Sequence, residues 1–437
     1  MIIGRIKYDL HQGVLVSITQ LKKWLKIQDK LWFTGYIATI VLPFGLIFNR
    51  GVAEACVAIV GVTFLATSIR DNKWNWLCDP VTKIGLLAWV WLLFVSIFAQ
   101  NISESFGVSI TWIRYLLIYA SLKNWILTRS DAICNLGKIL AIILLFVIVD
   151  TLWQYIFGVS ITGNLRDISG RLTGPLDNVK VGIFMAKMLF PIIGIYLFFA
   201  SVKENKIEII GGIFLLIMSI STILLTGERT AFASTMISLL AGAFLLAITE
   251  RKLTKTISMV VFIIIIESIF LLKTQSHVQG RSHQFFDVIS NYLASEYGQL
   301  QKAGIIIGWE HLQTGAGLKG FRELCHQLFV SGVITTENLH PHNLYIEWFA
   351  ETGIIGFLLF TSLVFCLFYK TFKAFLASKG IERLLPIFAI STLIVNFFPF
   401  MPTQSIFSNW SAILLWYSIS VAMASMNVIS EKENKRK

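Results

Sequence analysis

The hydrophobic pattern of this chain consists of apolar stretches of roughly twenty residues separated by short polar or basic segments. A stretch of this length crosses the hydrocarbon core of a bilayer as an α-helix. The pattern therefore predicts an all-α, polytopic membrane protein. We expect about twelve spans, near residues 31–48, 51–69, 83–99, 107–121, 136–157, 180–201, 208–226, 230–249, 255–272, 344–369, 382–400 and 407–427.

A basic lead-in, a long loop and a basic tail complete the predicted organisation. Residues 1–30 are expected to form an amphipathic helix on the cytoplasmic membrane surface. Residues 31–272 hold spans one to nine, and residues 273–341 form an extracytoplasmic loop. Residues 342–427 hold spans ten to twelve, and residues 428–437 form the cytoplasmic tail. Because the first long apolar run follows a polar segment, we expect no cleavable signal peptide.

The distribution of Lys and Arg predicts the orientation in the membrane. With the N-terminus in the cytoplasm, the inner segments carry 25 of the 37 Lys and Arg residues, and the outer loops carry 9. Cytoplasmic loops of membrane proteins show this excess, so both termini are predicted in the cytoplasm. The same asymmetry accounts for the net charge of +12, and no nucleic-acid partner is expected. Only 14% of the residues are charged, whereas a soluble protein has about 25%.

The long loop contains apolar residues at helical spacing, which form one face of an amphipathic helix. They are Phe285, Phe286, Ile289, Leu293, Tyr297 and Leu300. We expect such helices to lie along the outer membrane interface. They could pack as a lid or could also contact the substrate. Farther along the loop, TGAGLKGF at 314–321 predicts a turn or a close backbone contact, because nucleotides are scarce outside the cytoplasm.

The segment HPHN directly precedes the tenth span. Asn343 can cap that helix by accepting hydrogen bonds from its first free amides, which places His342 at the water boundary. An imidazole with a pKa near 6.5 is a suitable general base at neutral pH, and binding of phosphate is the other role open to His342. His340 is the competing candidate. Gly353 and Gly356 are predicted to share a helix face and to let another helix approach closely.

Two arginines lie in short outer loops, Arg171 in GRLTGPLDN and Arg229 in TGERTAF. A guanidinium is a planar, always-charged fork that suits phosphate oxygens. Each arginine could instead snorkel to lipid head groups or pair with a neighbouring acid, Glu228 or Asp177. The composition of the loops leaves both interpretations open.

Three charged residues fall inside predicted spans: Arg114, Asp150 and Lys187. Each lies about 10 Å below the outer surface, given the rise of an α-helix. Charges within a membrane usually pair with one another or line a functional cavity. We therefore predict that Asp150 pairs with Arg114 or Lys187. The same groups could line a groove for a lipid diphosphate.

No metal or cofactor is expected from the sequence. The five cysteines include no CxxC pair, and no DxD pair typical of a metal-dependent nucleotide-sugar enzyme occurs. His277 and His283 do not form a metal motif. His311 and His326 are expected to be surface residues of the loop.

The order of these motifs resembles that of the O-antigen ligase and polymerase superfamily, membrane glycosyltransferases of the GT-C type. GRLTGPLDN, GERTAF and the His-Asn pair followed nine residues later by Gly-x-x-Gly are similar to the three motifs of that family. The resemblance implies that Arg171 and Arg229 hold the diphosphate of an undecaprenyl-diphosphate glycan, with His342 at the sugar-transfer centre. Asn343 and Lys187 are expected among the substrate-binding residues.

Two further details of the resemblance concern the outer loops. Arg281, in QGRSHQFF, is similar to a recurrent arginine of the family and is a candidate substrate-binding residue. The family loop often has Asn-Pro where this chain has Asn178-Val179. This departure changes the expected turn and leaves Arg171 in place.

The resemblance implies an inverting glycosyltransferase of the bacterial inner membrane, with its active site facing the periplasm and membrane lipids around it. The expected donor is an undecaprenyl-diphosphate-linked glycan, and the expected acceptor is the lipid A core of lipopolysaccharide, as for an O-antigen ligase. An O-antigen polymerase, which joins lipid-linked repeat units, is the alternative within the family, and a protein-specific glycan ligase is another. The chain length and the single long loop favour the ligase.

A membrane transporter or flippase is the alternative from a different class. It predicts a water-filled path across the bilayer. The enzyme predicts a pocket that is open outward and closed inward, with a side opening for lipid.

Overall fold

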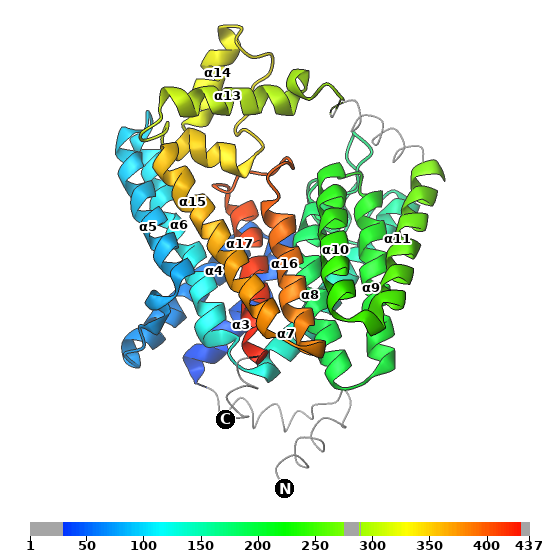
Figure 1. Cartoon of the computed structure of the whole chain (residues 1–437). Helices are drawn as coiled ribbons and strands as arrows, with labels where there is room; N and C mark the ends of the chain where they lie inside the picture. The colour runs from blue at the N-terminus through cyan, green and yellow to red at the C-terminus, as the bar shows by residue number, and fades with distance from the viewer. Residues whose placement is uncertain (1–28, 275–287, 289, 430–437) are drawn as a thin grey trace.

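The computed structural model describes residues 29–274, 288 and 290–429 (Figure 1). Twelve of the described helices, some of them together with an adjoining helical turn, are long and apolar enough to cross a membrane, which confirms the predicted all-α, polytopic architecture. They are α3 (Lys30–Phe48), α4 (Arg50–Arg70), α5 (Pro80–Val95), α6 (Ile102–Ser121), α7 (Ser130–Phe157), α8 (Val181–Val202), α9 (Lys206–Leu225), α10 (Arg229–Thr249), α11 (Thr254–Thr274), α15 (Leu344–Ala377), α16 (Leu384–Phe397) and α17 (Asn409–Ser425). The predicted lead-in, except for its last two residues, lies outside the described residues.

Polar side chains in the short connections cap the helices that follow them. Asp29, Asn49, Asn101 and Asn205 each accept a hydrogen bond from an amide in the first turn of the next helix. These amides have no partner within their own helix. The connections therefore fix where the spans begin.

Two shorter helices, α13 (Glu296–Glu310) and α14 (Phe321–Val330), belong to the long loop. Figure 1 shows them at one end of the bundle, with the start of α3 and the end of α17 near the opposite end. The loop and the two described chain ends thus lie on opposite faces. The assignment of the loop face to the periplasm stays a prediction from the charge distribution.

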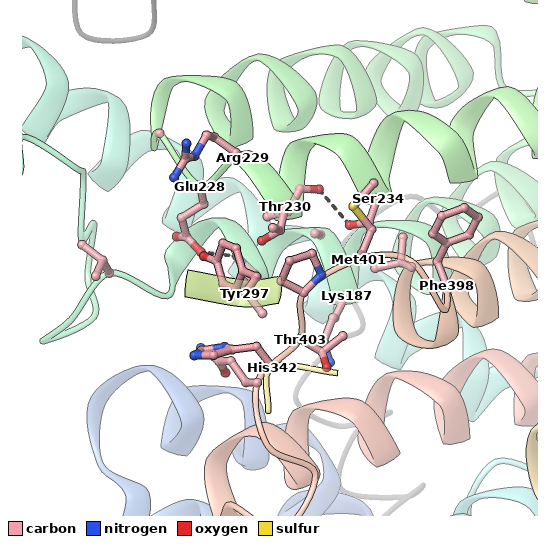
Figure 2. A pocket seen from close by; sticks show the side chains of 18 of the residues that line it. Lys187, Glu228, Arg229, Thr230, Ser234, Tyr297, His342, Phe398, Met401 and Thr403 are labelled. Atoms are coloured by element: carbon pink, nitrogen blue, oxygen red, sulfur yellow. Dashed lines mark hydrogen bonds between the residues drawn. The ribbon is translucent and has the colours of Figure 1, made fainter. Parts of the chain in front are cut away.

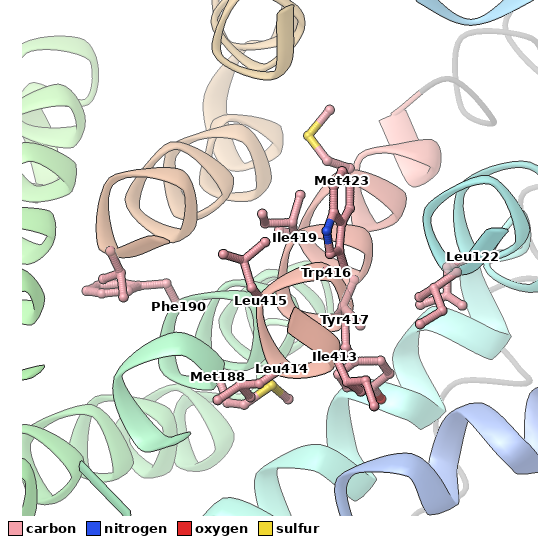
Figure 3. Close-up of a cluster of buried hydrophobic side chains, with 14 of the residues drawn as sticks. Leu122, Met188, Phe190, Ile413, Leu414, Leu415, Trp416, Tyr417, Ile419 and Met423 are labelled. Atoms are coloured by element: carbon pink, nitrogen blue, oxygen red, sulfur yellow. The ribbon is translucent and has the colours of Figure 1, made fainter. Parts of the chain in front are cut away.

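The core of the bundle forms around α17, which is buried along nearly its whole length. Figure 3 shows Leu414, Leu415 and Trp416 projecting from α17 in different directions, with Met188 of α8 nearby. A helix that is apolar on every side is suited to such a central position. The Tyr417 hydroxyl donates a hydrogen bond of 2.9 Å to the carbonyl of Thr39, which ties α17 to α3.

Helix α15 is interrupted at Gly353, and the predicted glycine face is wrong for this residue. Gly353 has φ 66° and ψ −171°, which is not helical. A Cβ there would lie 2.7 Å from the carbonyl oxygen of Gln313, so the backbone of the long loop, rather than another helix, approaches it. The Ile354 amide donates a hydrogen bond of 2.9 Å to the carbonyl of Leu312 at this break. The interruption docks the loop onto the membrane bundle.

The long loop packs through the buried face of α13, which contains Leu300, Ala303 and Ile307. These residues form a small core with Phe321 of α14 and Ala350 of α15. Gly315, whose φ is +69°, lies against the backbone between Glu351 and Thr352, so the close contact predicted for the glycine-rich run is present. Phe285, Phe286 and Ile289 lie outside the described residues.

The predicted pairing of Asp150 with Arg114 or Lys187 is wrong. Arg114 lies 3.9 Å from Glu54 and donates a hydrogen bond of 2.7 Å to Asn409. Asp150 accepts a hydrogen bond of 3.0 Å from the Thr162 amide. Loop backbone, instead of a basic side chain on another span, thus binds one oxygen of this buried carboxylate. The other oxygen, Oδ2, has no hydrogen-bond partner among the described residues.

The Gly353→Ala substitution should destabilise the protein by at least about 1–3 kcal/mol, because only glycine readily adopts this backbone conformation. The added Cβ would also meet the Gln313 carbonyl. The midpoint of thermal unfolding in detergent measures the effect. Gly107→Ala is the matched control, since nothing lies within 4 Å of that position. Equal midpoints for both variants would contradict the docking role of the interruption.

Candidate functional site

A cavity of about 220 Å³ lies where α8, α10, α13 and the segments flanking α15 and α16 meet. Figure 2 shows Lys187, Tyr297 and His342 around it, with Glu228 and Arg229 at one side. Arg171, Lys187, Arg229 and His342 all line this cavity. The structure therefore brings together four candidate residues that belong to four separate segments of the chain.

The Arg171 loop is built on the buried end of α7. Gln154, fully buried, accepts hydrogen bonds of 2.9 Å from the amides of Thr173 and Gly174. Its side-chain nitrogen donates a bond of 2.8 Å to the Thr173 hydroxyl. Together with the Asp150 bond, these contacts hold a non-helical segment in one conformation, as buried backbone requires.

The two arginine loops are linked directly. The Leu172 amide donates a hydrogen bond of 3.3 Å to the carbonyl of Thr226. These residues lie next to Arg171 and close to Arg229 in the sequence. The backbone contact therefore places the two guanidinium-bearing segments side by side.

Glu228 joins the start of α10 to the start of α8. Its carboxylate accepts hydrogen bonds of 2.6 Å from the Gly182 amide and 3.1 Å from the Ile183 amide. Burial raises the pKa of Glu228 to about 7, although these amides and the charge of Arg171 act in the opposite direction. The carboxylate caps α8 and so positions Lys187, which lies in the second turn of that helix. The predicted pairing partner of an arginine thus has a different, backbone-binding role.

His342 lies in the loop before α15, and its backbone conformation and hydrogen bonds fix its position. Its φ is +53°, an uncommon conformation for a residue with a side chain. Its carbonyl accepts a hydrogen bond of 2.8 Å from the Thr403 amide. The ring packs against Tyr297 at 5.4 Å between centroids and against His340 at 4.1 Å.

Asn343 caps α15 as predicted, with its side-chain oxygen accepting hydrogen bonds from the amides of Tyr345 and Ile346. Its side-chain nitrogen donates a bond of 2.8 Å to the carbonyl of Pro399. Asn343 does not line the cavity, and its side chain joins the start of α15 to the segment after α16. Its predicted contact with the substrate is untested.

Burial lowers the pKa of His342, and the charge of Glu296 and the Thr403 backbone oppose this effect. Burial is therefore the dominant cause of the lowered pKa of His342. The pKa of His340 falls to about 3, through burial and the neighbouring His342 and Lys319. Both rings are therefore neutral at neutral pH.

His342 and His340 differ in their access to the cavity. His342 lines it, whereas His340 does not. The Nε2 atom of His340 is buried and has no hydrogen-bond partner among the described residues. Geometry thus favours His342 as the candidate that contacts a ligand.

Arg281 lies outside the described residues, so its predicted role remains a prediction.

The loop after α16 contributes cavity residues that the sequence motifs did not reveal. Met401, Pro402 and Thr403 line the cavity, and the Thr403 hydroxyl is buried without a partner in the described chain. Glu347 holds this loop by accepting a hydrogen bond of 3.1 Å from the Ile406 amide. These residues form no recognisable sequence motif, because a hydroxyl or a backbone group can occur in any loop. The sequence therefore did not identify them as cavity residues.

The arrangement is suited to binding an anion next to a neutral imidazole. Arg171, Lys187 and Arg229 place positive charge around one enclosed space, where electrostatic interactions are stronger than in water. Guanidinium groups bind phosphate oxygens through paired hydrogen bonds. His342 lies at the same cavity and can accept a proton.

A sequence model described as O-Antigen ligase matches residues 213–361 of the chain, about a third of its length. The matched segment includes Arg229, His342 and Asn343 and begins after Arg171 and Lys187. None of the curated proteins compared with the chain matches it.

Replacement of Glu228 by Ala should destabilise the protein by about 1–3 kcal/mol, because two buried amides would lose their acceptor. Glu228→Gln retains a side-chain oxygen and should cost less. Thermal unfolding of both variants in detergent at pH 7 measures the difference. Equal losses for Ala and Gln would show that the hydrogen bonds to α8 are not what Glu228 contributes.

Proposed function

We propose that the chain belongs to the O-antigen ligase superfamily of membrane proteins, whose sequence model matches residues 213–361, and that it is an inverting glycosyltransferase acting on lipid-linked glycans. In this proposal it transfers an O-antigen-type glycan from undecaprenyl diphosphate to the lipid A core of lipopolysaccharide, at the periplasmic face. The observation that supports it is the cavity shared by Arg171, Lys187, Arg229 and His342.

The basic residues would act on the leaving diphosphate. Cleavage of the bond between the sugar and the phosphate transfers negative charge to the diphosphate as the bond breaks. Preorganised cations stabilise charge that develops in the transition state, which is usually the largest catalytic contribution. Arg171 and Arg229 would bind the phosphate oxygens, and Lys187 would add positive charge deeper in the cavity.

His342 would remove the proton from the attacking hydroxyl of the acceptor. A general base must be neutral before the reaction, and burial favours the neutral ring of His342. Attack on C1 from the side opposite the diphosphate inverts the anomeric centre. The proton then resides on the imidazole, and the negative charge leaves with the diphosphate.

The depth of the cavity argues against a transporter. On α8 its lining ends at Lys187, and on α10 it ends at Ser234. The next residues of α8, Met188 and Leu189, are fully buried in the apolar core. The apolar residues beyond Lys187 and Ser234 favour the enzyme over a transporter, which needs a water-filled path across the bilayer.

Deletion of the gene should produce lipopolysaccharide with a core that lacks the O-antigen chain, while polymer accumulates on the carrier lipid. Gel analysis of lipopolysaccharide shows this result. A core that bears one repeat unit would instead indicate a polymerase. An unchanged pattern would reject both activities.

Complementation separates the role of His342 from folding. We expect the His342→Ala variant to lower transfer by about 10²–10⁴-fold, as loss of a general base does, and to leave the deletion phenotype. His326→Ala, in an exposed histidine of the same loop that pairs with Glu337, should complement fully. Near-full transfer by a normally folded His342→Ala variant would exclude His342 as the general base.

The pH dependence of kcat/KM should show an acid limb whose midpoint lies below 6.5, because His342 must lose its proton to act and its pKa is lowered. The lowered pKa also means that its contribution to stability, present above pH 6.5, declines as the pH falls toward the folded-state pKa. Return to pH 7.5 after acid exposure therefore serves as the control for unfolding. A midpoint above 6.5 would contradict the assignment.

A further inference from the structure

A second cavity, of about 270 Å³, lies deeper in the bundle and is almost entirely apolar. Helices α8, α9, α10, α11 and α16 line it, with residues such as Phe190, Leu239, Val260 and Ile387. Ser391 is one of its few polar residues, and its hydroxyl donates a hydrogen bond of 3.0 Å to the carbonyl of Ser238. An apolar space of this kind excludes water and binds hydrocarbon.

The same three helices line both cavities in succession. On α8, Lys187 lines the polar cavity and Phe190 lines the apolar one. On α10 the corresponding residues are Ser234 and Leu239, and on α16 they are Val395 and Ser391. About one helical turn separates the two cavities on each helix. A charged space therefore lies directly above a hydrocarbon-lined space along one seam.

Helix α11 forms the outer wall of the apolar cavity. It lies at the edge of the bundle (Figure 1), and few of its described residues are buried. Val260 and Ile257 of α11 face the cavity, while Phe262 and Phe270 are exposed. On this side a peripheral helix covers the cavity, which suits entry of a hydrocarbon chain from the side.

We propose that the apolar cavity binds the first part of the polyprenyl chain of the lipid-linked donor while its diphosphate occupies the cationic cavity. This inference rests on the proposed function. An amphipathic substrate with a doubly charged head and a long hydrocarbon chain matches the order of the two spaces along α8, α10 and α16. Because the bilayer is itself apolar, the benefit is close packing and orientation of the chain, which holds the sugar–phosphate bond next to His342.

Chain-length dependence of the donor tests the inference. The purified protein is assayed with the same glycan diphosphate on a C55 and on a C10 prenyl chain. For the wild type we expect a KM at least about tenfold lower with C55, a difference of about 1.4 kcal/mol in binding. Ala243→Trp, which fills the cavity from α10, should raise the KM for the C55 donor toward that for C10 and should change the KM for the C10 donor less.

Ala241→Trp is the matched control, because Ala241 lies on the same helix and does not line the cavity. It should leave both KM values unchanged. Equal effects of Ala243→Trp on both donors, or no effect on either, would overturn the inference. So would equal KM values of the wild type for C55 and C10.

A labelling experiment separates this inference from the proposed function. A photoreactive undecaprenyl phosphate should label peptides of α10 and α11 in the wild type and in Ala241→Trp, with at least about a tenfold loss in Ala243→Trp. Absence of glycan transfer together with this labelling would reject the function but keep the chain site. Equal competition by phospholipid would show an ordinary lipid in the cavity and overturn the inference.

Discussion

Buried acceptor side chains at the ends of the helices hold the irregular backbone that surrounds the cationic cavity. Within a membrane, backbone amides must find partners inside the protein, and non-helical segments persist only where they do. Gln154 binds the amides of the Arg171 loop, Glu228 binds the first amides of α8, and Glu347 binds the loop after α16. Each of these side chains comes from a different helix. Their hydrogen bonds fix two loops and the first turn of α8 around the cavity.

This arrangement also shapes the charge of the cavity. Arg171, Lys187 and Arg229 line the cavity together with one acid, Glu228. The carboxylates of Glu228 and Glu347 each accept hydrogen bonds from backbone amides. Positive groups gathered in a partly dry site favour an anionic ligand, because attraction between charges is strong there. His342, kept neutral by burial, adds a proton acceptor to the same space. The basic residues would thus bind the anion, and the histidine would transfer the proton.

The two cavities along α8, α10 and α16 give the bundle a polar-to-apolar gradient that matches a lipid-linked donor. Such a gradient would serve a ligase and a polymerase equally, since both use the same kind of donor. In the proposed function, the difference between them concerns the acceptor, which would approach from the end of the bundle where α13 and α14 lie. The long loop is therefore where we expect the two activities to diverge.

Several features of the site could be predicted from the sequence because they are local. The helix start after HPHN could be predicted because Asn343 is a good capping residue. Its side-chain oxygen accepts hydrogen bonds from amides only two and three residues further along the chain. The failures concern long-range geometry. Asp150 has a charge that suggested a basic partner, but the nearest donor is the amide of Thr162. Gly353 has helical neighbours in the sequence, and only contact with the loop at Gln313 explains its conformation.

The sequence by itself determined the twelve spans, the positions of the arginine and histidine motifs and the chemical types available for catalysis. Hydropathy over twenty residues and hydrogen bonds between near neighbours are properties of short segments, so they can be read along the chain. Only the tertiary structure decided that Arg171, Lys187, Arg229 and His342 surround one cavity. Their convergence depends on how α7, α8, α10 and α15 pack, and packing depends on side-chain shape and on buried hydrogen bonds between residues far apart in sequence.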